Sequence, residues 1–297
     1  MSNIFAFPKL MRAGLGNMLV PWAKCYLWCV DNNAKMIDPF WTKFRLGPYI
    51  RGERDIRRYG RLFHHHHIHG LRRIYLLLTS KKIKVENFSH IDDINRNCII
   101  IFEGMAGFQT LLGRSLEVKS ELERITKKRF LPGVMRNGFI GIHVRFGDYS
   151  TNNNACHESW HSRIHISWYL SALREIRKQL GFDMEALVFS DGSDFELHDL
   201  LCAPNVSRSP YSESITDLLA LSHAGIIIGS CSSFSMWGAY LSQAPVVWKK
   251  GRRPGSVLDD INLECEWLEG EKFDENFLVS LRKFHQLNNT DLLQLNR

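Results

Sequence analysis

The second half of the chain alternates short apolar runs with longer stretches in which apolar residues recur every three or four positions. Short runs of this kind are typical of buried strands, and the longer pattern is typical of helices. Strands that alternate with helices indicate a parallel sheet with helical crossovers. The pattern predicts strands at 138–145, 186–192 and 226–230, and helices at 165–181, 212–225 and 233–242.

Residues near the ends of these helices indicate where each one starts and stops. Ser167 is placed to cap the N-terminus of helix 165–181, and Gly181 is placed to end it. Ser214 and Asp217 have the Ser-x-x-Asp spacing of a capping box at the start of the next helix. A structural role is therefore one interpretation of Asp217.

The first half of the chain begins with a similar pattern. A short apolar piece leads to "GLGN" at 14–17, and residues 18–32 have helical periodicity. Asn17 is a candidate N-cap for this helix, which would place Pro21 in the first turn, where proline costs least. The pattern further predicts a strand at 98–104 and a charged helix at 115–128.

These elements predict two α/β domains joined near residues 130–137. A length of 297 residues is enough for two domains, each with its own core. We expect the first domain at 1–135, the second at 136–262, and a helical tail at 263–297.

The composition is that of an ordinary globular protein, with 44% hydrophobic and 23% charged residues. No long uncharged apolar run appears, and a Gly/Asn break interrupts the N-terminus where a signal peptide needs its apolar region. We therefore expect a cytoplasmic protein. The 7 cysteines are odd in number and include no Cys-x-x-Cys pair, which argues against a disulfide scaffold and a structural zinc site.

The formal net charge of +7 favours an anionic partner, such as nucleic acid, a membrane surface or a phosphorylated small molecule. The basic residues form no single block interleaved with aromatic ones, which argues against nucleic acid, while peripheral contact between the basic surface and a membrane stays open. "HHHHIH" at 64–69 suggests either a solvated loop or a metal site. We favour the loop, because consecutive His side chains do not converge as ligands on a helix or strand.

The chemistry is expected where parallel strands end, because open parallel sheets bind ligands outside the carboxyl ends of their strands. Alternation along strand 138–145 sends His143 and Arg145 off one face and Phe146 off the other. Arg145 can hold a phosphate through two charge-assisted hydrogen bonds. "SCSSF" at 230–234 supplies hydroxyls and backbone N–H groups at a helix N-terminus, which favours an anion.

Each of these residues also has a structural explanation. Arg145 could form a surface salt bridge, and Asp191 could be a turn residue. Ser232 or Ser233 could cap helix 233–242. The "GLGN" loop could be a tight turn. The functional interpretation gains weight because the candidates cluster at strand ends of one domain.

Taken in order, these motifs resemble the fucosyltransferases that share a His-x-Arg strand motif, most closely the bacterial α-1,2-fucosyltransferase family. The resemblance spans roughly residues 12–250 and rests on "GLGNML", "EGMAGFQT" (103–110), "HVRFGDY" (143–149), "VFSDG" (188–192) and "SSFSMWGAYL" (232–241). The family patterns that correspond to the third and fourth are His-Val-Arg-Arg-Gly-Asp-Tyr and Phe-Ser-Asp-Asp. Several motifs in one order are hard to explain by chance.

The resemblance implies a GT-B type glycosyltransferase, with two Rossmann-like domains facing a cleft. It implies GDP-fucose as donor, a glycan hydroxyl as acceptor, often galactose O2, and inversion at the sugar carbon. It implies no cofactor and no metal, and a place in glycan or O-antigen biosynthesis. Residues 1–135 would face the acceptor and 136–262 would bind the GDP-sugar.

The resemblance also implies roles for individual residues. Arg145 would hold the β-phosphate and stabilise the departing GDP, His143 would lie against the nucleotide, and Asp217 would accept hydrogen bonds from guanine. Residues expected to complete the donor site are Asp191, Ser232, Ser233 and Phe234. Gly16 and Asn17 would face the fucose or the acceptor.

The departures of the chain from the family pattern include positions 146, 18 and 236. Phe146 replaces a second Arg, Met18 replaces a Gln, and Met236 replaces a Trp. Inversion requires a base near the attacking hydroxyl, and Asp148 and Glu103 are the candidates, neither of which the sequence selects. Other interpretations keep the fold but change the sugar or linkage, or make the protein a non-catalytic nucleotide-sugar binder or a basic nucleic-acid binder.

Overall fold

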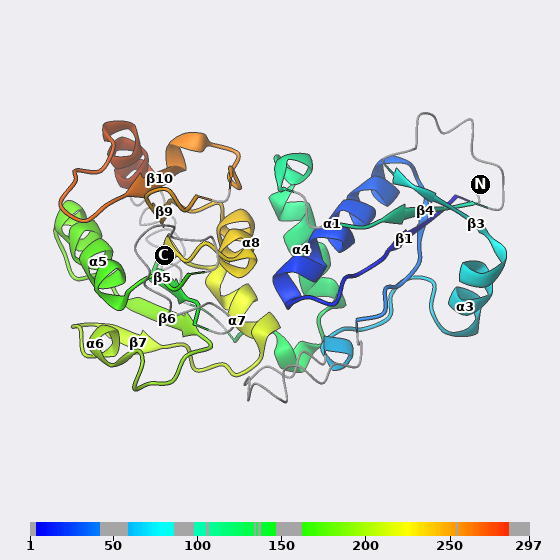
Figure 1. The fold of residues 1–297 in the computed structure, drawn as a ribbon, viewed down its shortest axis with the longest axis horizontal. Coiled ribbons are helices and arrows are strands. Elements are labelled where there is room, and N and C mark those ends of the chain that lie inside the picture. Colours follow the sequence, from blue (N-terminus) through cyan, green and yellow to red (C-terminus); the bar gives the residue numbers. More distant parts are fainter. Residues whose placement is uncertain are drawn as a thin grey trace, which may run out of the picture. The chain divides into compact units, whose positions relative to one another are not determined.

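The chain folds into two compact units, Met1–Leu131 (unit 1) and Pro132–Arg297 (unit 2), each built on a parallel sheet (Figure 1). The computed structural model describes residues 4–41, 59–85, 98–104, 107–133, 135, 138–146, 162–253 and 255–284. The predicted α/β class with two Rossmann-like parallel sheets is therefore confirmed.

The sheet of unit 1 has the order β2-β1-β4-β3, and all its strand pairs are parallel. Its strands are β1 (Phe5–Pro8), β2 (Lys35–Met36), β3 (Lys81–Lys84) and β4 (Cys98–Phe102). Its helices are α1 (Leu15–Asp31), α3 (Gly70–Thr79) and α4 (Ser115–Ile125), with 3-10 turns η1 (Tyr59–Arg61), η4 (Gln109–Leu111) and η5 (Lys128–Phe130). Alternate residues of β1 and β4 form a buried cluster on which α3 packs, and α1 also contacts both strands.

The sheet of unit 2 has the order β10-β9-β8-β5-β6-β7, again all parallel. Its strands are β5 (Ile140–Val144), β6 (Ala186–Ser190), β7 (Val206–Arg208), β8 (Ile226–Gly229), β9 (Val246–Lys249) and β10 (Glu264–Trp267). Its helices are α5 (Ile166–Leu180), α6 (His198–Leu201), α7 (Ser214–Leu221) and α8 (Ser233–Ser242), with η6 (Ile261–Leu263) and a last helix at 275–284.

This strand order places a crossover point beside β5. The chain runs from β5 outward through β6 to β7, then returns through α7 to β8 on the other side of β5. The order is that of doubly wound nucleotide-binding sheets, in which the ligand lies outside the carboxyl ends of the two strands where the winding reverses. In unit 2 these strands are β5 and β8.

Alternation along β5 divides its side chains between two layers. Ile140, Ile142 and Val144 are fully buried in the core cluster that includes residues of α5. Gly141 faces the opposite layer, where a Cβ atom would lie 2.4 Å from Cδ1 of Leu221 in α7. The glycine thus permits the close approach of α7 to the sheet, and His143 leaves the strand on that same side.

The predicted strands at 138–145, 186–192 and 226–230 are confirmed as β5, β6 and β8, and helix 233–242 is confirmed as α8. The predicted strand at 98–104 and helix at 115–128 correspond to β4 and α4.

Three of the predicted helix starts are wrong. His165 rather than Ser167 caps α5, because its side chain accepts the Ser167 backbone N–H, while Gly181 ends the helix at φ 79° as predicted. The helix predicted to follow Asn17 begins earlier, at Leu15. The Ser214–Asp217 capping box does not form, since Glu213 is the residue that precedes α7.

Two consequences follow from the earlier start of α1. Asn17 lies within the first turn and is not a cap, and Pro21 lies in the second turn. Pro21 has no N–H to donate to the carbonyl of Asn17, so α1 lacks one helical hydrogen bond there.

The predicted helical tail at 263–297 is also wrong in its first part. Residues 264–267 form β10, which pairs with β9 and extends the sheet of unit 2. Cys265 and Trp267 belong to its core cluster, and Glu266 points outward. None of the helices in the described part of the chain is long and apolar enough to cross a membrane.

Candidate functional site

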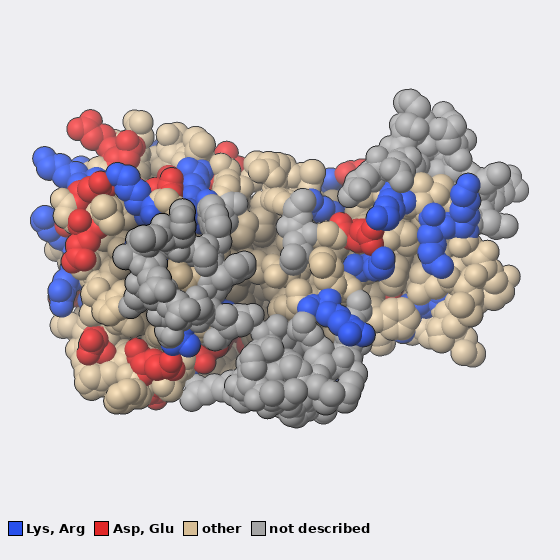
Figure 2. Space-filling model, in the orientation of Figure 1, with Lys and Arg blue, Asp and Glu red and all other residues tan. Residues whose placement is uncertain are grey.

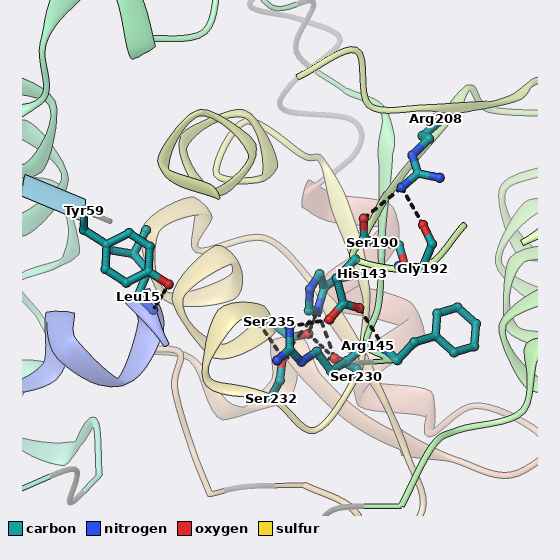
Figure 3. A network of polar contacts seen from close by, with 12 residues as sticks. Leu15, Tyr59, His143, Arg145, Ser190, Gly192, Arg208, Ser230, Ser232 and Ser235 are labelled. Atoms are coloured by element: carbon teal, nitrogen blue, oxygen red, sulfur yellow. Dashed lines mark hydrogen bonds and ion pairs between the residues drawn. The ribbon is translucent and has the colours of Figure 1, made fainter. Parts of the chain in front are cut away.

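A buried polar network joins the carboxyl ends of β5 and β8, at the crossover point of unit 2 (Figure 3). Nδ1 of His143 lies 2.9 Å from Oγ of Ser230 and 2.7 Å from Oγ of Ser235. The imidazole ring stacks on Phe234, with 4.7 Å between ring centroids. His143 is therefore held between the hydroxyls that follow β8 and an aromatic ring of α8.

The environment of His143 keeps its imidazole neutral. Burial, followed by the nearby positive charge of Arg145, lowers the pKa of His143 to about 3. A neutral ring can exchange hydrogen bonds with hydroxyl groups but carries no charge toward an anion. His143 is thus suited to packing and hydrogen bonding, not to proton donation near neutral pH.

Ser232 serves two purposes at the N-terminus of α8. Its Oγ accepts the backbone N–H of Ser235 at 3.4 Å, so Ser232 is the N-cap that the sequence suggested. The same Oγ lies 3.1 Å from Oγ of Ser230 and 3.4 Å from Nδ1 of His143. Ser233 is the first helical residue and is half-buried, as is Phe234.

Arg145 follows β5 directly and forms an ion pair with Asp191, which follows β6. Nη1 of Arg145 lies 2.5 Å from Oδ2 of Asp191, and the two side chains are 27% and 24% exposed. Oδ1 of Asp191 accepts the backbone N–H of Phe146 at 2.8 Å. One carboxylate thus orients the guanidinium and ties the two strand ends together.

Phe146 points away from Arg145, as alternation predicted. The ring is buried in the core cluster that α5 covers, and the guanidinium of Arg163 lies 5.0 Å from its centroid. Gly192 makes room for this ring, because a Cβ atom there would lie 2.3 Å from Cδ2 of Phe146. The departure from the family pattern at residue 146 therefore lies on the opposite face from Arg145.

Arg208, the last residue of β7, fixes the loop that follows β6 (Figure 3). Its Nη2 donates to the carbonyl oxygens of Ser190 at 3.0 Å and Gly192 at 2.7 Å. Its Nη1 donates to Asp194. These bonds hold both neighbours of Asp191, so Arg208 supports the residue that orients Arg145.

Asp217 lies in the first turn of α7. Its Oδ1 accepts a hydrogen bond from the hydroxyl of Ser209, the residue after β7. Burial raises the pKa of Asp217 to about 6, although the Ser209 hydroxyl and the charge of Arg208 act in the opposite direction. Hydrogen bonds that a ligand donates to such a partly desolvated carboxylate stabilise its ionised form.

The "GLGN" candidates lie in unit 1, within the first turn of α1. Gly16 is buried and Asn17 is half-buried, while Met18, at one of the departures from the family pattern, is buried in the core. The backbone N–H of Leu15 donates to the phenol oxygen of Tyr59 at 3.2 Å. One N–H of this helix start is thus already bonded within the unit.

Glu103 is a poor candidate for a base. Its carboxylate lies 2.8 Å from Nζ of Lys9 and 2.5 Å from Nζ of Lys84. Hydrogen bonds from Lys84 and Lys9 lower the pKa of Glu103 to about 2. Such a weak base does not draw a proton from a hydroxyl. The other candidate base, Asp148, lies outside the described residues.

The His run forms a loop, as predicted. His65 Nδ1 lies 3.0 Å from Oδ2 of Asp38, and His67 Nε2 lies 3.2 Å from Oε1 of Glu121. Within the described residues, no three His, Cys, Asp or Glu side chains are arranged as ligands for a metal ion. The loop is therefore anchored to unit 1 through two carboxylates.

Three residues of the unit 2 network were not singled out from the sequence: Arg208, Ser209 and Ser235. Arg208 ends a strand of 3 residues and Ser209 follows it, and a strand this short is hard to detect from the hydrophobic pattern. Ser235 lies three positions after Ser232, so the Ser-x-x-Ser spacing could have indicated two hydroxyls on one helix face.

One comparison with known proteins finds a family that part of this chain matches. The sequence model "Glycosyl transferase family 11" matches residues 114–248, which include the strands and loops of the network. No match is found among curated proteins.

Several solved structures are distantly similar to this chain. NodZ fucosyltransferase from Bradyrhizobium is 14% identical, with 86% of this chain and 98% of that chain covered and a TM-score of 0.48. A FUT1 variant from Arabidopsis thaliana in complex with GDP is 10% identical, with 86% and 72% covered and a TM-score of 0.49. POFUT1 in complex with GDP is 12% identical, with 84% and 98% covered and a TM-score of 0.48.

The family match confirms the resemblance inferred from the motifs, because it covers the His-x-Arg strand, the loop after β6 and the Ser-rich start of α8. Residues 114–248 therefore match glycosyl transferase family 11, over somewhat less than half of the chain.

Proposed function

We propose that this glycosyltransferase moves L-fucose from GDP-fucose to a glycan hydroxyl, with inversion at the sugar carbon and without a metal ion or other cofactor. The observation that best supports a nucleotide-diphosphate site is the arrangement at the crossover point of unit 2. There Arg145, the neutral His143 and the Ser230–Ser232–Ser235 hydroxyls meet at the ends of β5 and β8. The motifs shared with fucosyltransferases support fucose as the sugar.

In the proposed reaction the acceptor oxygen bonds to C1 of fucose while the bond between C1 and the diphosphate oxygen breaks. Negative charge grows on the β-phosphate of the departing GDP, and Arg145 stabilises it. A guanidinium has several N–H donors, so Arg145 can keep its bond to Asp191 while it binds the phosphate. Asp191 acts here by positioning Arg145.

We assign the base-recognition role to Asp217. The N1–H and exocyclic amine of guanine are adjacent donors, which match the two oxygens of one carboxylate. Uracil offers a single ring N–H between two carbonyls and matches it less well. Ser232, Ser233 and Phe234 would line the pyrophosphate and base, with His143 packed beneath them.

On the acceptor side, the proposal gives Gly16 and Asn17 of unit 1 contact with the fucose or the acceptor. The proposed product has an α-1,2 bond to galactose, and the proposed location is cytoplasmic, in glycan or O-antigen synthesis. Asp148 is the proposed base that accepts the proton of the acceptor hydroxyl, because the carboxylate of Glu103 is already ion-paired with Lys9 and Lys84.

An array of glycan acceptors incubated with GDP-fucose and read by mass tests the proposal. We expect a mass increase of one deoxyhexose on acceptors with terminal galactose. Arg145→Lys should abolish the increase while the protein stays folded, since Lys lacks the planar fork of donors. A mass increase only with another nucleotide sugar would overturn the donor assignment, and full activity of Arg145→Lys would remove Arg145 from the mechanism.

A further inference from the structure

One face of helix α3 presents large apolar side chains to solvent. Leu71, Ile74, Tyr75 and Leu78 are 85%, 46%, 65% and 79% exposed. Their spacing of three, four and seven positions places them on a single side of the helix. Isolated exposed apolar residues are common, but a contiguous apolar helix face usually marks an interaction site.

The opposite side of α3 is held to unit 1. Leu76 and Leu77 pack against the buried cluster of β1 and β4. Nη1 of Arg73 donates to the carbonyl oxygens of Asp38 at 3.3 Å and Pro39 at 3.2 Å. Its guanidinium carbon also lies 3.9 Å from the centroid of the Phe40 ring. The helix is therefore fixed in an orientation that leaves its other face outward.

The segment that carries this apolar face is rich in positive charge. Residues 59–85 contain the cations Arg61, Arg72, Arg73, Lys81, Lys82 and Lys84, and no Asp or Glu. Arg72, Lys81 and Lys82 are exposed. In Figure 2 the surface where Figure 1 draws α3 is mostly tan, with blue Lys and Arg side chains beside it toward β3.

We propose that this face, formed by Leu71, Ile74, Tyr75 and Leu78 with Arg72, Lys81 and Lys82 at its border, binds the surface of an anionic lipid bilayer. The apolar side chains would enter the interface between headgroups and acyl chains, and the cations would contact lipid phosphates. Leu and Ile contribute buried apolar area, and Tyr favours the boundary between apolar and wet surroundings.

Charge selects the bilayer over a second copy of the chain. In a symmetric dimer through this face the same cations would meet each other, which is unfavourable. An anionic bilayer instead offers negative charge and an apolar layer together. The inference is independent of the sugar and the nucleotide assigned to unit 2, because it rests on unit 1 alone.

Vesicle flotation with the full chain tests the inference. We expect binding to vesicles of phosphatidylcholine mixed with phosphatidylglycerol, weaker binding in high salt, and little binding to phosphatidylcholine alone. The double variant Leu71→Asp/Leu78→Asp and the charge variant Lys81→Glu/Lys82→Glu should each lower the partition coefficient about tenfold or more.

Leu116→Asp is the matched control. Leu116 lies on α4 of the same unit and is 79% exposed, like Leu78, so the same change there should leave vesicle binding unaltered. Thermal unfolding of each variant shows that it is folded. Wild-type-level binding by folded Leu71→Asp/Leu78→Asp, or equal binding to both vesicle types, would overturn the inference. A change from dimer to monomer with unaltered vesicle binding would assign the face to self-association instead.

Discussion

Phe146 and Gly192 are two departures from the family pattern that fit each other. The resembling family has a second Arg where this chain has Phe146, and a second Asp where it has Gly192. The Phe146 ring occupies the space that a side chain at residue 192 would need. At positions 146 and 192 this chain therefore has a packed contact where the family pattern has two charged side chains. The neighbouring residues Arg145 and Asp191 form an ion pair.

We expect Gly192→Ala to destabilise the protein by about 1–3 kcal/mol, because the added methyl group displaces the Phe146 ring. When Phe146 is also replaced by Ala, Gly192→Ala should lower the free energy of unfolding much less, because the ring that the methyl group would displace is absent. Urea unfolding of the wild type, both single variants and the double variant measures this coupling. If the two effects simply add, the contact does not control packing here.

The proposed role of Asp217 in guanine binding predicts that donor binding depends on pH. Its pKa of about 6 in the free protein means that the carboxylate gains a proton as the pH falls below 6, and a protonated acid no longer accepts both guanine donors. GDP affinity should therefore fall between pH 7 and pH 5. Calorimetric titration should show this loss in the wild type, whereas Asp217→Asn should bind GDP weakly at both pH values.

The same residue should limit stability at neutral pH. Because its folded pKa is raised, the folded state binds more protons than the unfolded state between about pH 4 and pH 6, so the Asp217 contribution to stability declines as the pH rises through that window. Asp217→Asn should then melt higher than the wild type at pH 7, with a smaller difference at pH 4. The lowered pKa of His143 makes stability rise with pH instead. His143 is present in both the wild type and Asp217→Asn, so its contribution cancels when the two are compared.

Among the elements, the loop after β6 couples three strands of unit 2. Arg208 from β7 holds the loop, and Asp191 within it orients Arg145 at the end of β5. Asp191→Asn keeps an oxygen for the Phe146 N–H but removes the charge that pairs with Arg145. We expect GDP to bind at least as tightly, because a nearby negative charge is gone, while kcat falls about tenfold as Arg145 loses its orientation.

Steady-state kinetics with GDP-fucose separates these two effects. An unchanged kcat for Asp191→Asn would mean that Arg145 is oriented by other contacts. Asp191→Ala also removes the bond to the Phe146 backbone, and so it should lose stability as well as turnover.

Strand and helix interiors could be predicted from the sequence where the local pattern determines them. Alternation placed His143 and Arg145 on one side of β5 and Phe146 on the other, as the structure has them. Helix ends were less predictable, because both His165 and Ser167 can act as an N-cap, and only the local geometry makes His165 the residue whose side chain accepts a backbone N–H. The contact of Ser235 with His143 and the contacts of Arg208 with the loop after β6 join residues from different strands and loops, so no local pattern shows those partners.

At the scale of the whole molecule, side chains and not a metal ion supply the positive charge that stabilises the departing GDP in the proposed reaction. Arg145 stands at the end of β5, and the chain as a whole carries a formal net charge of +7. His65 and His67 of the His run are hydrogen-bonded to Asp38 and Glu121 within unit 1. We therefore expect EDTA to leave both the transfer rate and the melting temperature unchanged. A transfer rate that EDTA abolishes and added Mg²⁺ or Mn²⁺ restores would show that a metal ion shares the phosphate with Arg145, and the role given to the guanidinium would then shrink to that of a second ligand.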